Sequence, residues 1–119
     1  NDDMLRAGGI WVSPAEIENT LLEHPDVAEC AVIGVEDEHR LVKPKAYVVL
    51  RENVQPTTEL EQEIQTTIRA KLAHYKCPRW IEFTDDLPKT ATGKIQRFKL
   101  RQLAQSTAPG ATLDARQSA

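Results

Sequence analysis

Several short segments of this chain have either the alternating or the continuously apolar pattern of a β-strand. Residues 5–12 alternate around Gly8-Gly9, which predicts a β-hairpin or a place where the backbone comes close to a ligand. The apolar runs at 27–34, 46–50 and 80–83 have the length and the residue types of strands. The pattern therefore predicts an N-terminal hairpin followed by a small sheet of about three strands.

Other segments have the apolar spacing of amphipathic helices. Residues 14–23 follow a capping box that begins at Ser13, with proline at the first helical position. Residues 58–74 carry apolar side chains four positions apart and should cover one face of the sheet, and residues 97–104 form a third helix. Together with the strands, these helices predict a single α+β domain without an internal repeat.

Length and charge exclude several classes of protein. The 119 residues carry 15 basic and 18 acidic side chains, and a net charge of −3 argues against a general nucleic-acid binder. No apolar run approaches the roughly 20 residues of a membrane span. The start at residue 1 lacks a signal-peptide pattern, so we expect a cytoplasmic piece of a larger protein. Residues 105–119 are small and polar and predict a disordered tail.

Cysteine and histidine residues do not suggest a metal site. Cys30 and Cys77 form no C-x-x-C pair, and we expect both to be buried free thiols. His24, His39 and His74 lack metal-ligand spacing, so no metal is expected in this domain.

The most informative segment is residues 87–97, a turn of small residues between two apolar elements. Gly93 leaves room for close backbone approach, and the ammonium of Lys94 could reach a phosphate or carboxylate oxygen. The plain alternative is a solvated basic turn. A P-loop is excluded, because Pro88 replaces its first glycine and Ile95 replaces the hydroxyl that binds magnesium.

Five motifs in order resemble the C-terminal domain of the AMP-forming adenylating enzymes, which include acyl-CoA synthetases, peptide-synthetase adenylation domains and luciferases. The resemblance covers nearly all of residues 1–104, and its motifs lie at residues 2–5, 8–18, 24–27, 75–78 and 87–97. Residues 6–14 are similar to benzoate and related aryl-acid CoA ligases. Two departures are Arg6, where lysine is usual, and Cys77, where several relatives have a basic residue.

The resemblance implies a mobile lid domain, formed by residues 1–104, that works with a large N-terminal domain of the same chain. That larger domain would hold the carboxylic acid and ATP, with magnesium accompanying the ATP. The lid would rotate between one pose for acyl-adenylate formation and another for thioester formation with coenzyme A. By itself the lid should be inactive.

The resemblance also implies roles for individual residues. Lys94 matches the adenylation lysine, and Asp2 matches the hinge. The glycines Gly8 and Gly9 match the segment that lines the pantetheine tunnel. The candidates for contact with the CoA phosphates are Lys76 and Arg79.

Purely structural interpretations of the same residues also remain open. Asp2 could be a turn residue, the two glycines a plain hairpin turn, and Lys76 and Arg79 solvated surface. Trp11 is read as hairpin packing, and residues 36–40 as a solvated connection.

Three alternative functions also remain open. The acceptor could be a carrier protein instead of CoA, or the chain could be a stand-alone interaction domain. Alternatively, Lys94 resembles the lysine that protein acetyltransferases modify in this family, and its acetylation would remove the charge.

Overall fold

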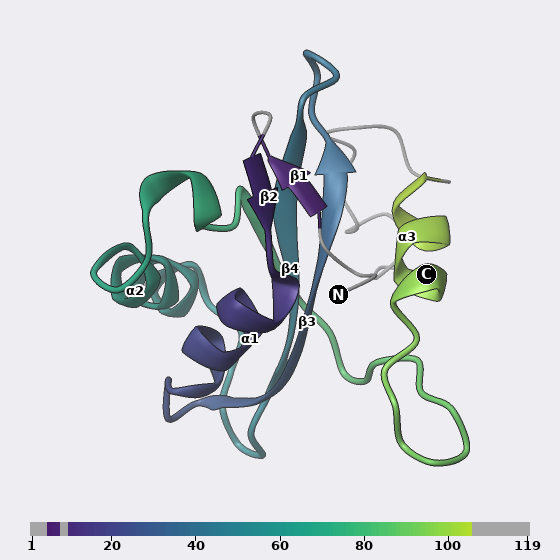
Figure 1. Ribbon diagram of the computed structural model, residues 1–119. Helices are drawn as coiled ribbons and strands as arrows, with labels where there is room; N and C mark the ends of the chain where they lie inside the picture. The colour runs from purple at the N-terminus through teal and green to yellow at the C-terminus, as the bar shows by residue number, and fades with distance from the viewer. Residues whose placement is uncertain (1–4, 8–9, 106–119) are drawn as a thin grey trace.

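The computed structural model describes residues 5–7 and 10–105. Two short antiparallel strands, β1 (Leu5–Ala7) and β2 (Ile10–Val12), form the expected hairpin pair. The main sheet follows, with β3 (Val27–Glu36), β4 (Val42–Leu50) and β5 (Trp80–Phe83). Its strand order is β3-β4-β5, with β3 antiparallel and β5 parallel to the central β4 (Figure 1). β3 and β5 are therefore the edges of this sheet.

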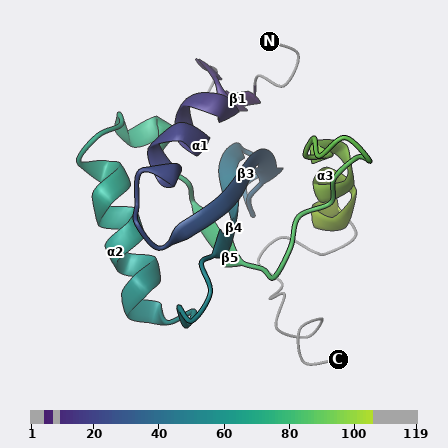
Figure 2. The same cartoon turned by 90° about the horizontal axis from the view of Figure 1, so that it is seen from below.

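Helices cover both faces of the sheet. α1 (Pro14–Leu22) and α2 (Thr58–Arg69) lie on one side, and α3 (Arg97–Gln105) lies on the other (Figure 2). Alternation along β3 divides the core, because Cys30 and Val32 join the cluster under α1 and α2, whereas Ala31 and Ile33 join the cluster under α3. The expectation of a hairpin, a three-stranded sheet and three helices is thus confirmed.

Side chains cap the starts of α1 and α2, at Ser13 as the sequence suggests and at Thr57, one residue before the suggested Thr58. The backbone N–H of Glu16 donates to Ser13 Oγ at the start of α1, at 3.4 Å. At the start of α2 the cap is Thr57, whose Oγ1 accepts from the N–H of Leu60 at 3.1 Å. Capping of this kind satisfies N–H groups that have no partner inside the helix.

Two predicted boundaries differ from the structure by four residues or more. The second strand begins at Val42, four residues earlier than expected, and so contains Pro44. The proline oxygen accepts from the N–H of Arg79 just before β5 begins, at a place where the missing proline N–H interrupts no strand pairing. α2 ends at Arg69 and not near residue 74, and a separate 3₁₀ turn, η1 (His74–Lys76), follows. Leu72 nevertheless packs against the core cluster that contains Ile64 and Ile68 of α2. This is why it continues their spacing of four residues although the helix has ended.

The sequence suggested a solvated connection at residues 36–40, but the structure shows a buried carboxylate there. Asp37 is buried, and its Oδ1 accepts from the N–H groups of Leu41 at 3.0 Å and His39 at 2.8 Å. The hydrogen bond from Leu41 is the main reason why the pKa of the Asp37 carboxyl lies below its usual value. This carboxylate organises the turn between β3 and β4, in which Arg40 has a φ of 63°.

The two cysteines differ in burial, so the expectation of two buried thiols is correct only for Cys30. Cys30 is buried, whereas Cys77 is half-buried. Burial raises the pKa of Cys30 to about 12, and burial also raises that of Cys77. Because only the thiolate reacts readily, alkylation at pH 8 should modify Cys77 before Cys30, and Cys30 should react only after unfolding. Peptide mapping after timed alkylation, with and without urea, checks this order; equal rates in the native protein would contradict it.

Candidate functional site

Residues 87–97, called here the lysine loop, form a projecting turn between the sheet and α3. Leu87 enters the loop from a buried position in the core under α3, and Ile95 packs against the same cluster on the way out. Lys89 and Ile95 form an isolated antiparallel bridge at the base of the loop. In Figure 1 the loop projects at the lower right, below α3. Apolar anchors therefore hold both ends of a polar tip.

Hydrogen bonds within the tip set its shape. The N–H of Thr90 donates to the carbonyl oxygen of Lys94 at 2.8 Å, and Thr90 Oγ1 accepts from the N–H of Lys94 at 3.1 Å. The N–H of Gly93 donates to the carbonyl of Thr90 at 2.9 Å, and Gly93 has a φ of +90°. That backbone conformation is rare for residues with a Cβ, so the turn requires glycine here. The tip is thus a defined structure in which Thr90 bonds to the lysine backbone.

The two lysines of the loop have different environments. Lys89 Nζ lies 2.6 Å from Glu29 Oε1 on β3, and this hydrogen bond raises the pKa of Lys89 above its usual value. The side chain of Lys94 is exposed, and none of the described residues forms an ion pair with it. The loop therefore presents one ammonium to solvent and uses the other against the sheet.

A buried carboxylate fixes the end of the loop. Arg97, the first residue of α3, donates from Nη2 to Glu18 Oε1 at 2.5 Å and from Nε to Glu18 Oε2 at 3.1 Å. Glu18 Oε2 also accepts from the backbone N–H of Val32 at 2.8 Å. α1, β3 and the start of α3 thus meet at one carboxylate.

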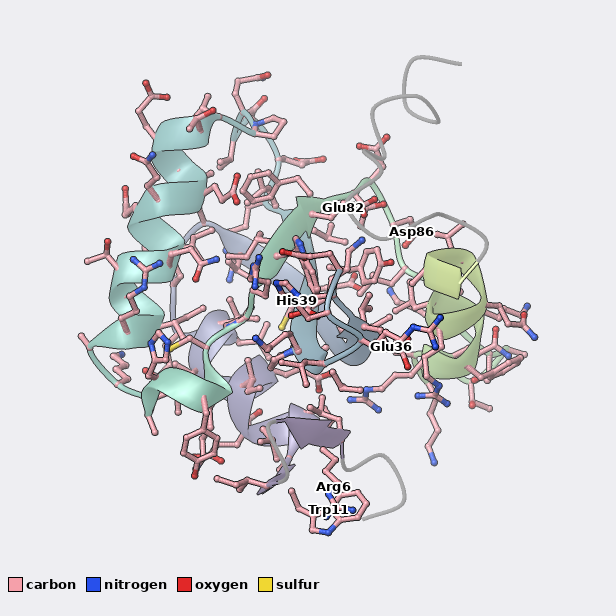
Figure 3. All side chains as sticks on the ribbon, turned by 90° about the horizontal axis from the view of Figure 1, so that it is seen from above. Arg6, Trp11, Glu36, His39, Glu82 and Asp86 are labelled. Atoms are coloured by element: carbon pink, nitrogen blue, oxygen red, sulfur yellow. The ribbon has the colours of Figure 1, made fainter. Side chains whose placement is uncertain are left out.

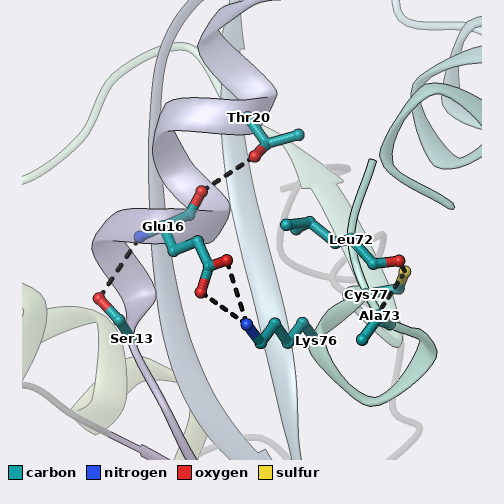
Figure 4. Close-up of polar contacts among 7 residues, drawn as sticks. All are labelled: Ser13, Glu16, Thr20, Leu72, Ala73, Lys76 and Cys77. Carbon is teal, nitrogen blue, oxygen red and sulfur yellow. Dashed lines mark hydrogen bonds and ion pairs between the residues drawn. The ribbon is translucent and has the colours of Figure 1, made fainter. Parts of the chain in front are cut away.

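The predicted CoA contacts Lys76 and Arg79 are both held by acids of this domain. Lys76 Nζ donates to both carboxylate oxygens of Glu16, at 3.0 and 3.1 Å, and this pair joins η1 to the first turn of α1 (Figure 4). Arg79 has looser pairs, 3.9 Å to Asp37 and 3.7 Å to Glu38, and its side chain is 45% exposed. Of the two cations, Arg79 is the more available to an added anion.

Three predicted site residues, Asp2, Gly8 and Gly9, lie outside the described residues. The strands beside the two glycines are described, and there Arg6 stacks on the Trp11 ring at 5.6 Å from its centroid. Trp11 is 60% exposed, so it packs against its hairpin partner and is not part of the core. Figure 3 shows both side chains at the periphery of the molecule.

The described candidates fall in two separate places. β1 and β2 lie in the upper half of Figure 1, on the same side as the β3–β4 turn that Arg79 contacts. The lysine loop projects from the opposite end. The structure therefore does not bring Lys94 together with the predicted CoA contacts.

Sequence reasoning gave Glu18 and Arg97 no role of their own, although both lie in the quoted motifs. A signal was present, because Glu18 lies four residues after Pro14 and three before Leu21 on the buried side of α1. A carboxylate at such a position needs a partner, since an unpaired buried charge is strongly unfavourable.

Among the described residues, no group of three metal-binding side chains occurs. No helix in this part of the chain is long and apolar enough to cross a membrane.

Comparison with known proteins agrees with the motifs. The family model of the AMP-binding enzyme C-terminal domain matches residues 16–94. The chain is 55% identical over 101 residues to a benzoate–CoA ligase of Thauera aromatica, covering 85% of this chain and 19% of that protein. It is 48% identical to 4-hydroxybutyrate–CoA ligase 1 of Metallosphaera sedula, covering 85% of this chain and 18% of that protein.

Solved structures give the same result. A crystal structure of an anthranilate CoA ligase in complex with anthranoyl-AMP matches with a TM-score of 0.85 and 59% identity, covering 87% of this chain and 20% of that one. The chain spans about a fifth of the length of the relatives it matches. The resemblance recognised in the motifs is therefore confirmed: the chain belongs to the AMP-binding enzyme C-terminal domain family.

Proposed function

We propose that this domain is the lid of an AMP-forming acid:CoA ligase, in which Lys94 supplies the cation for acyl-adenylate formation. In the first half-reaction, a carboxylate attacks the α-phosphate of ATP and pyrophosphate leaves. In the second, the thiol of CoA displaces AMP from the adenylate. The domain would rotate between a pose for each step.

The presentation of Lys94 carries this proposal. Attack of a carboxylate on a phosphate brings two anions together and spreads charge over phosphoryl oxygens, so a positioned cation lowers the barrier. Lys94 is exposed on a loop with fixed ends and has no ion-pair partner among the described residues, so it is free to reach an anion on another domain. Lys89 is already paired with Glu29 and is less suited to this role.

The second pose would use the opposite end of the domain. We assign Asp2 to the hinge and the glycines Gly8 and Gly9 to the wall of the pantetheine tunnel, where the absence of a Cβ leaves room for the thiol arm. Arg79 is favoured over Lys76 as the contact to a CoA phosphate, because its ion pairs are longer and its side chain more exposed. The turn that Arg79 contacts and the strands β1 and β2 lie at the end opposite the lysine loop, which suits a domain that presents one end at a time.

ATP, magnesium and the acid would be held mainly by the N-terminal domain of the same chain. Magnesium prefers oxygen ligands and commonly binds together with nucleotide phosphates. We favour benzoate or a related aryl acid, because the benzoate–CoA and anthranilate CoA ligases named above are 55% and 59% identical to this chain. Comparing benzoate with 4-hydroxybutyrate as the substrate tests the choice of acid. Comparing CoA with a carrier protein tests the choice of CoA as the acceptor of the acyl group.

The deciding experiment separates the two half-reactions in the full-length enzyme that contains this domain. Pyrophosphate release from acid plus ATP reports adenylation, and thioester formation from a supplied acyl-adenylate reports the second step. With Lys94→Ala, loss of the first and survival of the second would support the proposal. No loss in either would return Lys94 to a solvated turn residue.

Control by a protein acetyltransferase is a second candidate function of the same loop. An acetyltransferase needs an accessible amine, and Lys94 is exposed, whereas Lys89 donates to Glu29 and has a raised pKa. We expect acetylation on Lys94 and not on Lys89, with loss of adenylation because the charge is removed. Peptide mass spectrometry of the treated enzyme locates the acetyl group. An acetyl group on Lys89 alone would contradict this prediction.

A further inference from the structure

We propose that Glu18 is a positioning residue for the adenylation step, acting through Arg97 on the lysine loop. This inference rests on the proposed function of Lys94 and extends it to a residue that lies outside the loop. Glu18 does not contact the reacting groups in this proposal. It fixes the position of Arg97, where the loop ends and α3 begins.

The carboxylate of Glu18 is itself firmly held. The residue as a whole is 8% exposed, and the N–H of Val32 on the edge strand β3 donates to Glu18 Oε2 at 2.8 Å. The thiol of Cys30, two residues earlier on the same strand, donates to the carbonyl oxygen of Glu18 at 3.4 Å. These two contacts join α1 to the free edge of the sheet. Glu18 therefore offers a fixed anion and not a mobile surface carboxylate.

Arg97, the last residue of the lysine loop, connects the loop to this fixed carboxylate. It lies three residues after Lys94, and its guanidinium binds both oxygens of Glu18, at 2.5 and 3.1 Å. A planar guanidinium that binds a carboxylate through two N–H groups has a defined orientation as well as a position. The residue just before it, Gln96, donates its N–H to the carbonyl of Pro88 at 2.8 Å, which links the two ends of the loop. A shift of Arg97 would thus move the end of the loop that positions Lys94.

The other anchor of the loop is weaker. Lys89 and Glu29 have side chains that are 32% and 39% exposed, whereas those of Arg97 and Glu18 are 21% and 11% exposed. Exposed ion pairs contribute little, because water and salt screen them, but a buried charge that loses its partner is left uncompensated. The Glu18 pair should therefore dominate the placement of the loop.

The test is Glu18→Gln in the full-length enzyme. Glutamine keeps the shape and can still accept from the N–H of Val32, but it removes the charge that holds Arg97. We expect adenylation to fall about tenfold or more, since small misplacements of a catalytic group are costly, while thioester formation from supplied acyl-adenylate stays within about twofold. The matched control is Glu82→Gln, which breaks the pair of Glu82 with Lys45 at similar burial (11% and 13% exposed). It should leave the ratio of the two half-reactions unchanged.

Coupling to Lys94 separates positioning from a general structural role. In a Lys94→Ala background, Glu18→Gln should cause little further loss of adenylation, because the group it positions is already absent. An equal loss of both half-reactions, or the same added loss with and without Lys94, would overturn the proposal. If Glu18→Gln fails to fold, Arg97→Lys keeps the charge without the two-pronged contact and should give the same imbalance between the half-reactions. Failure of the proposed function itself would be visible separately, as normal adenylation in Lys94→Ala alone.

Discussion

Replacing Lys94 with alanine should slow acyl-adenylate formation about 10²- to 10³-fold, the loss typical when one group that stabilises transition-state charge is removed. The ammonium would act where negative charge develops on phosphoryl oxygens, whereas the other cations of the loop face this domain, Lys89 toward Glu29 on β3 and Arg97 toward Glu18 on α1. Thioester formation from a supplied adenylate should stay near its wild-type rate, since Lys94 would be turned away in that pose. Single-turnover measurement of each half-reaction gives the two rates independently.

Two variants control this prediction. Lys89→Ala removes a lysine from the same loop and should change adenylation less than about fivefold, because its exposed ion pair contributes little. Lys94→Arg keeps the positive charge but changes its shape and reach, and should retain part of the activity. Equal loss of both half-reactions in Lys94→Ala would instead indicate a role in folding. A loss as large in Lys89→Ala would show that the loop needs its overall charge and not one positioned cation.

The order and type of the elements could be predicted because local chemistry determines them. Ser13 caps α1, and the apolar run at residues 27–34 lies within β3, whose two faces both pack against core clusters. Boundaries were less predictable where tertiary contacts decide them. β4 begins at Val42 and not at residue 46 as expected, and it contains Pro44, which falls just outside the segment of β4 that pairs with β5.

The candidate site was predictable only in part. The role of Lys94 came from the resemblance of residues 87–97 to a family motif, and the sequence alone did not distinguish its environment from that of Lys89. That distinction arises from Glu29 on β3, which is distant in the sequence. The contact between Glu18 and Arg97 joins residues 79 positions apart, and no local pattern contains such information. Charged residues on buried helical faces are therefore a useful place to look for supporting residues.

Replacing Gly93 with alanine should slow adenylation about tenfold without removing any charge. Gly93 has a φ of +90°, and a residue with a Cβ is strained there by roughly 1–3 kcal/mol. The cause would be backbone conformation and not a clash, because no atom lies within 4 Å of the added Cβ beyond the neighbouring residues. If the loop relieves the strain by changing shape, only a fraction of molecules would present Lys94 correctly, and each 1.4 kcal/mol reduces that fraction about tenfold.

Gly93→Asn tests this explanation, because asparagine tolerates positive φ better than alanine does. It should therefore lose less adenylation activity than Gly93→Ala, although its side chain is larger. Thioester formation from supplied adenylate should be normal in both variants. If asparagine were as harmful as alanine or worse, the glycine would be needed for space, as when another domain closes over the loop. If neither variant lost activity, the positive φ of Gly93 would have no part in presenting Lys94, and the anchors at the two ends of the loop would suffice.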